Sequence, residues 1–186
     1  MTNRVEMRFS APDFGMMAQE LRDNIPNLIA ATLQTQRGMM FDLAGANNGH
    51  EAWLPLKYRK GSPLKDTGTL SQSIGPRNNG IVAGRGVGSI VRLSQQEVTI
   101  GTEIPYAIIH DKGATVKAHE VMIWRNKKSG KFQKYSNKRG NLEIYNVAEY
   151  KIPARPFSGI NAEDEKEIAE TVENYITEVW NKYGKN

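Results

Sequence analysis

The six residues Ile152–Phe157, with the sequence IPARPF, directly precede the strongest amphipathic pattern in the chain. Pro153 and Pro156 each fix φ at about −65° and disfavour the α-helical region in the preceding residue. The segment is therefore predicted to be extended, so that the helix after it begins at a set place. We expect Phe157 to fill the groove between that helix and a sheet. Arg155 is expected to point away from the backbone, to pair with a carboxylate, to cap a carbonyl or to be presented to a neighbouring subunit.

The helix after this segment is predicted to span Ala162–Tyr183. Its apolar residues recur with the spacing of one helix face, and we expect that stripe to pack on a sheet. The stripe consists of Ile168, Val172, Ile176, Val179 and Tyr183. The first turn contains three carboxylates that complement the positive end of the helix dipole: Glu163, Asp164 and Glu165. Gly184 follows the last turn, where glycine commonly ends a helix.

The rest of the chain predicts a long N-terminal helix and a β-rich middle. The helix is expected from Ser10 to Ala44, and Pro26 inside it must kink or split it. Pro105 and Gly113 are expected to open and close a helical turn. Strands are predicted at short β-branched or alternating runs: Arg4–Phe9, Ile81–Ala83, Ser89–Leu93, Glu97–Thr102, Val116–Trp124, Lys131–Tyr135 and Leu142–Tyr150.

The predicted fold class is α+β. We expect a twisted antiparallel β-sheet with a kinked N-terminal helix and a C-terminal helix packed on it, plus a protruding basic β-hairpin. The length of 186 residues and the 39% hydrophobic content fit a single domain, residues 1–186. Within it, residues 116–150 are predicted to form a hairpin arm inserted before the C-terminal helix. We recognise no signal peptide and no long apolar run, so no membrane contact is expected.

The sequence contains no recognisable catalytic pattern. It has no cysteine, which excludes disulfides, thiolate metal ligands and a cysteine nucleophile. His50, His110 and His119 do not have the spacing of metal ligands. The glycines of Gly84–Gly88, GRGVG, are not followed by the residues of a phosphate-binding loop and are typical of a hairpin tip. We therefore expect no enzymatic activity, no cofactor and no metal. A metal-dependent hydrolase that uses His110 and Asp111 is the rival in this class.

Positive charge is concentrated in the segment Arg125–Arg139, which contains seven cations and no acid. The cations are Arg125, Lys127, Lys128, Lys131, Lys134, Lys138 and Arg139. The interleaved aromatic residues Trp124, Phe132 and Tyr135 suit stacking on single-stranded nucleic acid. They also suit a β-hairpin whose lysines protect its edge from aggregation. We favour the hairpin arm, and we expect it to reach the acidic start of the last helix in the next copy or an acidic surface of the tail. A nucleic-acid-binding module is the alternative function.

Four pieces of sequence occur in a characteristic order: WLPL, LKDTGTLSQSI, VTIGTEIPYAIIHDKG and IPARPF. Together they resemble the phage virion morphogenesis family, the tail completion proteins of Mu-like and P2-like phages and prophages. The resemblance extends from about Trp53 to the C-terminus. The motif positions are Trp53, Asp66, Gly68, Tyr106, His110, Gly113, Pro153, Arg155, Pro156 and Phe157. The interval between Gly113 and Ile152 is longer than in typical members, and the N-terminal helix is only loosely comparable.

The resemblance implies a structural virion protein that completes the tail or joins it to the head, without catalytic residues or cofactors. Expected partners are other copies in a hexameric ring and the tail tube, tail terminator or head connector proteins, with DNA passing through the ring as a further candidate. The expected location is the virion tail or head–tail junction, after assembly in the host cytoplasm. Asp66 is expected to cap a short helix through Gly68. Tyr106 and His110 share one face of a helical turn, where they pack on the sheet or line a subunit contact.

Overall fold

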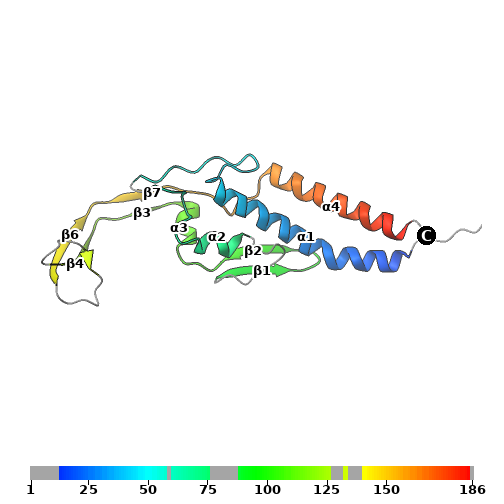
Figure 1. Cartoon of the computed structure of the whole chain (residues 1–186), viewed down its shortest axis with the longest axis horizontal. Helices are drawn as coiled ribbons and strands as arrows, with labels where there is room; N and C mark the ends of the chain where they lie inside the picture. The colour runs from blue at the N-terminus through cyan, green and yellow to red at the C-terminus, as the bar shows by residue number, and fades with distance from the viewer. Residues whose placement is uncertain (1–12, 58–59, 76–87, 127–131, 134–139, 185–186) are drawn as a thin grey trace, which may run out of the picture. The chain divides into compact units, whose positions relative to one another are not determined.

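The computed structural model describes residues 13–57, 60–75, 88–126, 132–133 and 140–184 (Figure 1). The helices are α1 (Phe14–Asp42), α2 (Thr69–Ile74), α3 (Ala107–Lys112) and α4 (Ala162–Tyr183). The strands are β1 (Ser89–Leu93), β2 (Val98–Thr102), β3 (Ala114–Val116), β4 (His119–Asn126), β5 (Phe132–Gln133), β6 (Gly140–Val147) and β7 (Tyr150–Ile152). The α+β class predicted from the sequence is confirmed.

The chain divides into two compact units. The first unit consists of the residues up to Ala107 together with those from Pro156 onward, and the second unit is Ile108–Arg155. Residues 116–150, predicted as an inserted arm, lie wholly within the second unit. The chain therefore passes between the units only after Ala107 and again inside the IPARPF segment.

Helix α1 begins at Phe14, after Asp13. The Asp13 side chain accepts a hydrogen bond from the Met16 backbone N–H at 3.0 Å, which caps the first turn. The helix then continues through Pro26 to Asp42, so the proline does not split it. Three predicted features lie outside the described residues: the helix start at Ser10 and the strands Arg4–Phe9 and Ile81–Ala83.

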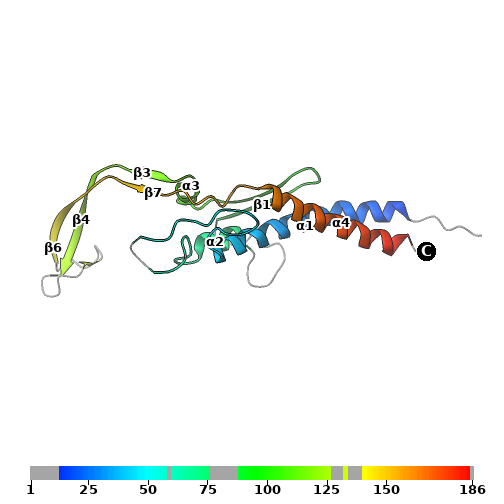
Figure 2. The same ribbon diagram turned by 90° about the horizontal axis from the view of Figure 1, so that it is seen from above.

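In the first unit, α1 lies between α4 on one side and α2 with the β1–β2 hairpin on the other (Figure 1). Glu20 contacts Lys182 near one end of the helix pair, and Gln36 contacts Glu167 near the other, so α1 and α4 are antiparallel. In Figure 2, seen from above, α4 crosses over α1. The two five-residue strands pair antiparallel from Ser89 opposite Thr102 to Leu93 opposite Val98.

This packing differs from the expected arrangement of both helices on one sheet. The described strands form three small antiparallel sheets, and α4 packs mainly along α1. The lengths of the elements explain why α4 packs on α1 and not on a sheet. A strand of five residues is about 17 Å long, whereas the 22 residues of α4 and the 29 of α1 extend about 33 and 44 Å. Only α1 offers an apolar surface as long as the stripe on α4.

The apolar stripe of α4 is buried along a narrower line than predicted. Val179 is 1% exposed, but Ile176 is 43% exposed, so the prediction that Ile176 packs in the interior is wrong. Tyr175 takes the position next to α1 instead, where its hydroxyl accepts a hydrogen bond from the Asn24 side chain at 2.9 Å. A helix that packs on one other helix buries a narrower stripe than one that packs on a sheet.

Replacing Val179 with alanine should lower the free energy of unfolding by about 1–3 kcal/mol, because buried methyl groups are lost and a cavity remains. Ile176→Ala is the matched control on the same helix, and its effect should stay below about 1 kcal/mol. Thermal unfolding followed by circular dichroism measures both. Equal losses would mean that Ile176 is covered in solution, contrary to the structure.

The second unit contains two separate β-ladders. Strand β3 pairs antiparallel with β7, and β4 pairs along its full length with β6, while β5 joins the other edge of β4. The segments Val116–Trp124 and Leu142–Tyr150 were each predicted as one strand. Each is interrupted, at residues 117–118 and 148–149, where the chain leaves one ladder and enters the other.

Gly113 links α3 to β3 in a conformation that other residues rarely adopt. Its φ is +73°, and an added Cβ would lie 2.8 Å from the Ala154 nitrogen and 2.9 Å from the Ile152 carbonyl oxygen. Both atoms belong to the backbone and cannot rotate away. The glycine of the HDKG motif is therefore required for the close approach of the two chain segments at this point.

Gly113→Ala should destabilise the second unit by about 2–4 kcal/mol, since the left-handed φ and the backbone clash both oppose the side chain. Gly159→Ala is the matched control, because its Cβ would meet nothing within 4 Å. Limited proteolysis, with the cleavage sites mapped by mass spectrometry, should show faster cutting between Ile108 and Arg155 only in Gly113→Ala. Equal cleavage of both variants would contradict the steric requirement.

Candidate partner-contact surfaces and the motif residues

The first and last motif pieces meet in the core of the first unit. The indole N–H of Trp53 donates to the Pro156 carbonyl at 3.0 Å. The rings of Trp53 and Phe157 both contact Phe41 of α1, with centroid distances of 5.4 and 5.6 Å. The same cluster contains Met40, Leu70, Ile74, Ile104 and Ala107. Phe157 is buried, as expected, and Pro156 and Phe157 at the end of the IPARPF segment are held against this cluster of the first unit.

A buried ionic cluster holds the start of α4. The Asp164 carboxylate accepts hydrogen bonds from the Arg37 guanidinium and from the Asn48 amide, and it lies 2.8 Å from Nε2 of His50. Its backbone N–H donates to the Asn161 side chain at 2.8 Å, and its side chain accepts from the Asn161 backbone N–H in return. These reciprocal bonds form a capping box that fixes where α4 begins.

The environment of Asp164 pulls its pKa in opposite directions. Burial raises the pKa, while hydrogen bonds from His50 and Arg37 and the charge of Arg37 lower it. The pKa lies below its ordinary value, so the carboxylate is held in its charged form. Neither Arg37 nor His50 was singled out as its partner from the sequence. They lie more than 100 positions away, and no local spacing reveals such a pair.

Asp164 was predicted to belong to an exposed acidic surface that contacts a partner, and that prediction is wrong. The residue is fully buried because its carboxylate neutralises Arg37 in the interior. Glu163 and Glu165 of the same turn are exposed. They leave acidic charge on the surface of α4 together with Glu170, Glu173 and Glu178.

Arg155 was considered as a residue presented to a neighbouring subunit, and the structure contradicts this. It is 5% exposed, and its backbone N–H donates to the His110 carbonyl at 2.7 Å. Burial lowers the pKa of Arg155. Burial, followed by the charge of Arg155, lowers the pKa of His110 as well, so neutral imidazole is favoured there. Arg155 therefore belongs to the interior, and His110 is half-buried.

Two other motif positions have local roles that differ from or refine the predictions. Helix α2 begins after Gly68, which adopts a left-handed φ of +77° at the N-cap, and the Thr67 hydroxyl accepts a hydrogen bond from the Thr69 backbone N–H at 3.3 Å. The N-cap position is therefore occupied by Gly68 and not by Asp66. Tyr106 lies in the turn before α3 and is 42% exposed.

Most of the basic segment lies outside the described residues. Arg125 lies in β4, opposite Phe132 of β5 and Asn141 of β6. The remaining cations, Lys127, Lys128, Lys131, Lys134, Lys138 and Arg139, fall in the ranges that the structure does not describe. The predicted contact between this segment and an acidic surface stays a prediction.

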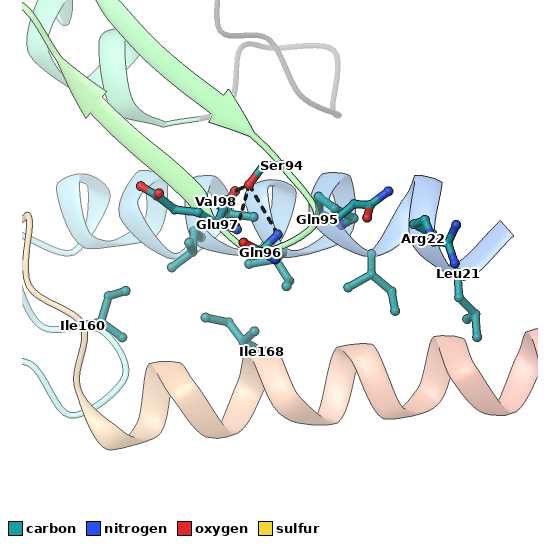
Figure 3. A pocket seen from close by; sticks show the side chains of 13 residues that line it. Leu21, Arg22, Ser94, Gln95, Gln96, Glu97, Val98, Ile160 and Ile168 are labelled. Atoms are coloured by element: carbon teal, nitrogen blue, oxygen red, sulfur yellow. Dashed lines mark hydrogen bonds between the residues drawn. The ribbon is translucent and has the colours of Figure 1, made fainter. Parts of the chain in front are cut away.

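An apolar groove of about 390 Å³ lies in the first unit between α1, α4 and the β1–β2 turn (Figure 3). Four residues spaced four apart on α1 form one wall: Leu21, Ile25, Ile29 and Leu33. Ile168 of α4 and Ile160 lie opposite, and the turn Ser94–Val98 covers the space. The spacing of four places the α1 residues on a single face, so the wall is continuous.

Within the described ranges, no three side chains among His, Asp and Glu are grouped as metal ligands would be. None of the helices in the same ranges is both long and apolar enough to cross a lipid bilayer.

Residues 15–177 match the phage virion morphogenesis family, and the chain belongs to that family. Its role therefore lies in the formation of phage particles. One relative is the Mu-like prophage FluMu G protein 2 of Haemophilus influenzae, which is 29% identical over 148 residues, 80% of this chain and 73% of the relative. No solved structure matches the chain. The resemblance deduced from the four motif pieces is confirmed, and the match also includes α1, which the motifs did not reach.

Proposed function

We propose that this protein completes the phage tail or joins it to the head, as a ring of identical copies. The observation that supports this is the family match over residues 15–177, which contains the motif positions Trp53, Gly113 and Phe157. These residues pack the core or shape the backbone. Because these motif residues stabilise the fold, we expect the protein to act through contacts on its surface, as a component of an assembly does.

A ring is the form of assembly that fits this role. A contact between two different surfaces of the same protein, repeated from copy to copy, closes into a ring when the rotation is right. A hexameric ring would match the symmetry of phage tails that the family resemblance implies. Its neighbours along the particle would be the tail tube, the tail terminator or the head connector.

Deletion of the gene from the phage or prophage tests this function. Electron microscopy of induced lysates should reveal filled heads and separate or irregular tails, and the protein supplied from a plasmid should restore complete particles. Immunogold labelling of these particles should mark the tail end or the head–tail junction. Normal particles without the protein would overturn the proposal.

Two measurements on the purified protein address the competing functions. Nuclease or protease turnover that requires a divalent metal and disappears in His110→Ala would overturn a purely structural role. DNA affinity that falls steeply with salt, combined with normal particle assembly by a variant with Lys127, Lys128 and Lys131 changed to Glu, would indicate a nucleic-acid-binding module instead.

A further inference from the structure

The β4–β6 ladder of the second unit exposes large apolar side chains on one face. Met122 stands directly opposite Ile144, and Leu142 lies two residues from Ile144 on the same side. Met122 is 72% exposed, Ile144 63% and Leu142 49%. Single exposed apolar residues are common, but adjacent ones on a sheet face mark an interaction surface. We call these three residues the apolar arm face.

The other face of the same ladder is more covered. Val121, Ile123 and Tyr145 alternate with the residues of the apolar arm face and are half-buried. The Tyr145 hydroxyl donates to the Glu143 carboxylate at 2.5 Å on that side. The apolar arm face is thus the side of the ladder that is free to receive a partner.

The first unit contains a complementary surface in the groove between α1, α4 and the β1–β2 turn. Its lining is mainly aliphatic, and in Figure 3 Ile160 and Ile168 lie at the end of the groove opposite Leu21 and Arg22. Ile160 is itself 53% exposed. An aliphatic groove with an exposed aliphatic rim has the chemistry to accept the methionine, isoleucine and leucine of the apolar arm face.

Charges favour the same pairing. The sequence between β4 and β6, residues 127–139, contains six cations and no acid. The groove is lined by exposed Arg22 and exposed Glu97, and exposed Glu165 precedes Ile168 by three residues, on the same side of α4. Acidic residues therefore outnumber Arg22 beside the groove, and their charge is opposite in sign to that of the sequence between β4 and β6, a complementarity that favours specific pairing.

We infer that the apolar arm face of one copy docks in the α1–α4 groove of the next copy. This inference rests on the ring of the proposed function and names the surfaces that build it. The two surfaces differ, so each copy both gives an arm and receives one. Repetition of the contact produces a closed ring when the geometry returns to the first copy.

Mixing two defective variants tests this directional contact. The arm variant carries Met122→Glu and Ile144→Glu, which place carboxylates in an apolar contact. The groove variant carries Ile160→Lys and Glu97→Lys, at two exposed positions. Each variant alone should associate at least about tenfold more weakly than the wild type. An equimolar mixture should form heterodimers, because the intact arm of the groove variant docks in the intact groove of the arm variant. The assembly stops at two copies, because the two remaining surfaces of the heterodimer are defective.

Sedimentation velocity and native mass spectrometry distinguish the outcomes, with Thr115→Glu, an exposed residue of β3, as the matched control for added charge. Circular dichroism checks that every variant is folded. Rings formed by the wild type and by Thr115→Glu, with heterodimers in the mixture, support the inference. A wild type that stays monomeric, an arm variant that assembles normally, or a mixture without heterodimers would overturn it.

Cysteine cross-linking gives a second readout, since the natural sequence contains no cysteine. Met122→Cys and Gln96→Cys, mixed and treated with a short bismaleimide, should form a cross-linked dimer that neither variant forms alone. A chain carrying both cysteines that cross-links only within itself would overturn the contact between copies. Normal assembly by the arm variant combined with tail defects in the gene deletion would overturn this inference alone and leave the proposed function standing.

Discussion

Phe157→Ala should lower the free energy of unfolding by about 3–5 kcal/mol, the usual cost of removing a buried aromatic ring. The Phe157 side chain is almost fully buried, and its ring contacts that of Phe41 on α1. The loss would leave a cavity between α1 and the IPARPF segment, next to Trp53. The melting temperature should fall by about 2–4 °C for each kcal/mol in a chain of this size.

Phe14→Ala provides the matched control for this measurement. Phe14 is a phenylalanine of the same unit, but it is 54% exposed, so its removal should cost less than about 1 kcal/mol. Urea unfolding of both variants measures the difference. Equal stability losses in Phe14→Ala and Phe157→Ala would contradict the placement of Phe157 in the core.

The variant Trp53→Phe separates the contribution of the aromatic ring to stability from that of its hydrogen bond. This variant keeps an aromatic side chain beside Phe41 and removes the donor to the Pro156 carbonyl. Pro156 is exposed, so water can replace the lost donor, and the hydrogen bond contributes only about 1 kcal/mol. The loss in Trp53→Phe should therefore be smaller than that in Phe157→Ala, which removes packing instead.

Local sequence signals located many of the elements. The β-branched run Ser89–Leu93 and the apolar periodicity of Ala162–Tyr183 gave the bounds that the structure has. Both signals depend on neighbours within a few residues, where side-chain periodicity reports directly on the backbone. The two prolines of IPARPF likewise act on adjacent residues, and no helix forms between the end of β7 and the start of α4.

Local sequence signals did not show which of these elements pack against one another. The apolar stripe on α4 indicates that another element covers it, but periodicity alone does not show whether that element is a sheet or α1. Because α1 is the partner, Tyr175 lies at the contact and Ile176 does not. The division of the strands of the second unit into two ladders depends on interruptions of two residues, at 117–118 and 148–149. Such breaks arise from tertiary packing and have no strong local signal.

Asp164 is the clearest case of a role set by distant residues. In the sequence it is one of three carboxylates in the first turn of a helix, and all three suit the helix dipole equally. The structure separates them, because only Asp164 meets Arg37 and His50 in the interior. The contribution of Asp164 to the free energy of unfolding therefore depends on its contact with Arg37, which lies 127 positions away in the sequence.

Asp164→Asn should lower the free energy of unfolding by about 3–5 kcal/mol, since removal of one partner leaves Arg37 buried without a counter-charge. Glu165→Gln is the matched control, an exposed carboxylate of the same helical turn, and should change stability by less than about 0.5 kcal/mol. Arg37→Met added to Asp164→Asn removes the orphaned charge and should recover much of the loss, because apolar replacements of buried ion pairs are tolerated.

The contribution of Asp164 should also depend on pH. Burial raises its pKa, but the hydrogen bonds from His50 and Arg37 and the charge of Arg37 bring it below the ordinary value of 3.8. Because the folded pKa is lower than the unfolded one, the stabilisation is complete above about pH 4–5 and is lost as the pH falls through the folded pKa. Urea unfolding at decreasing pH should therefore show the stability gap between the wild type and Asp164→Asn narrowing below pH 3.8. A gap that stays constant through this range would mean that the charge of Asp164 does not stabilise the fold.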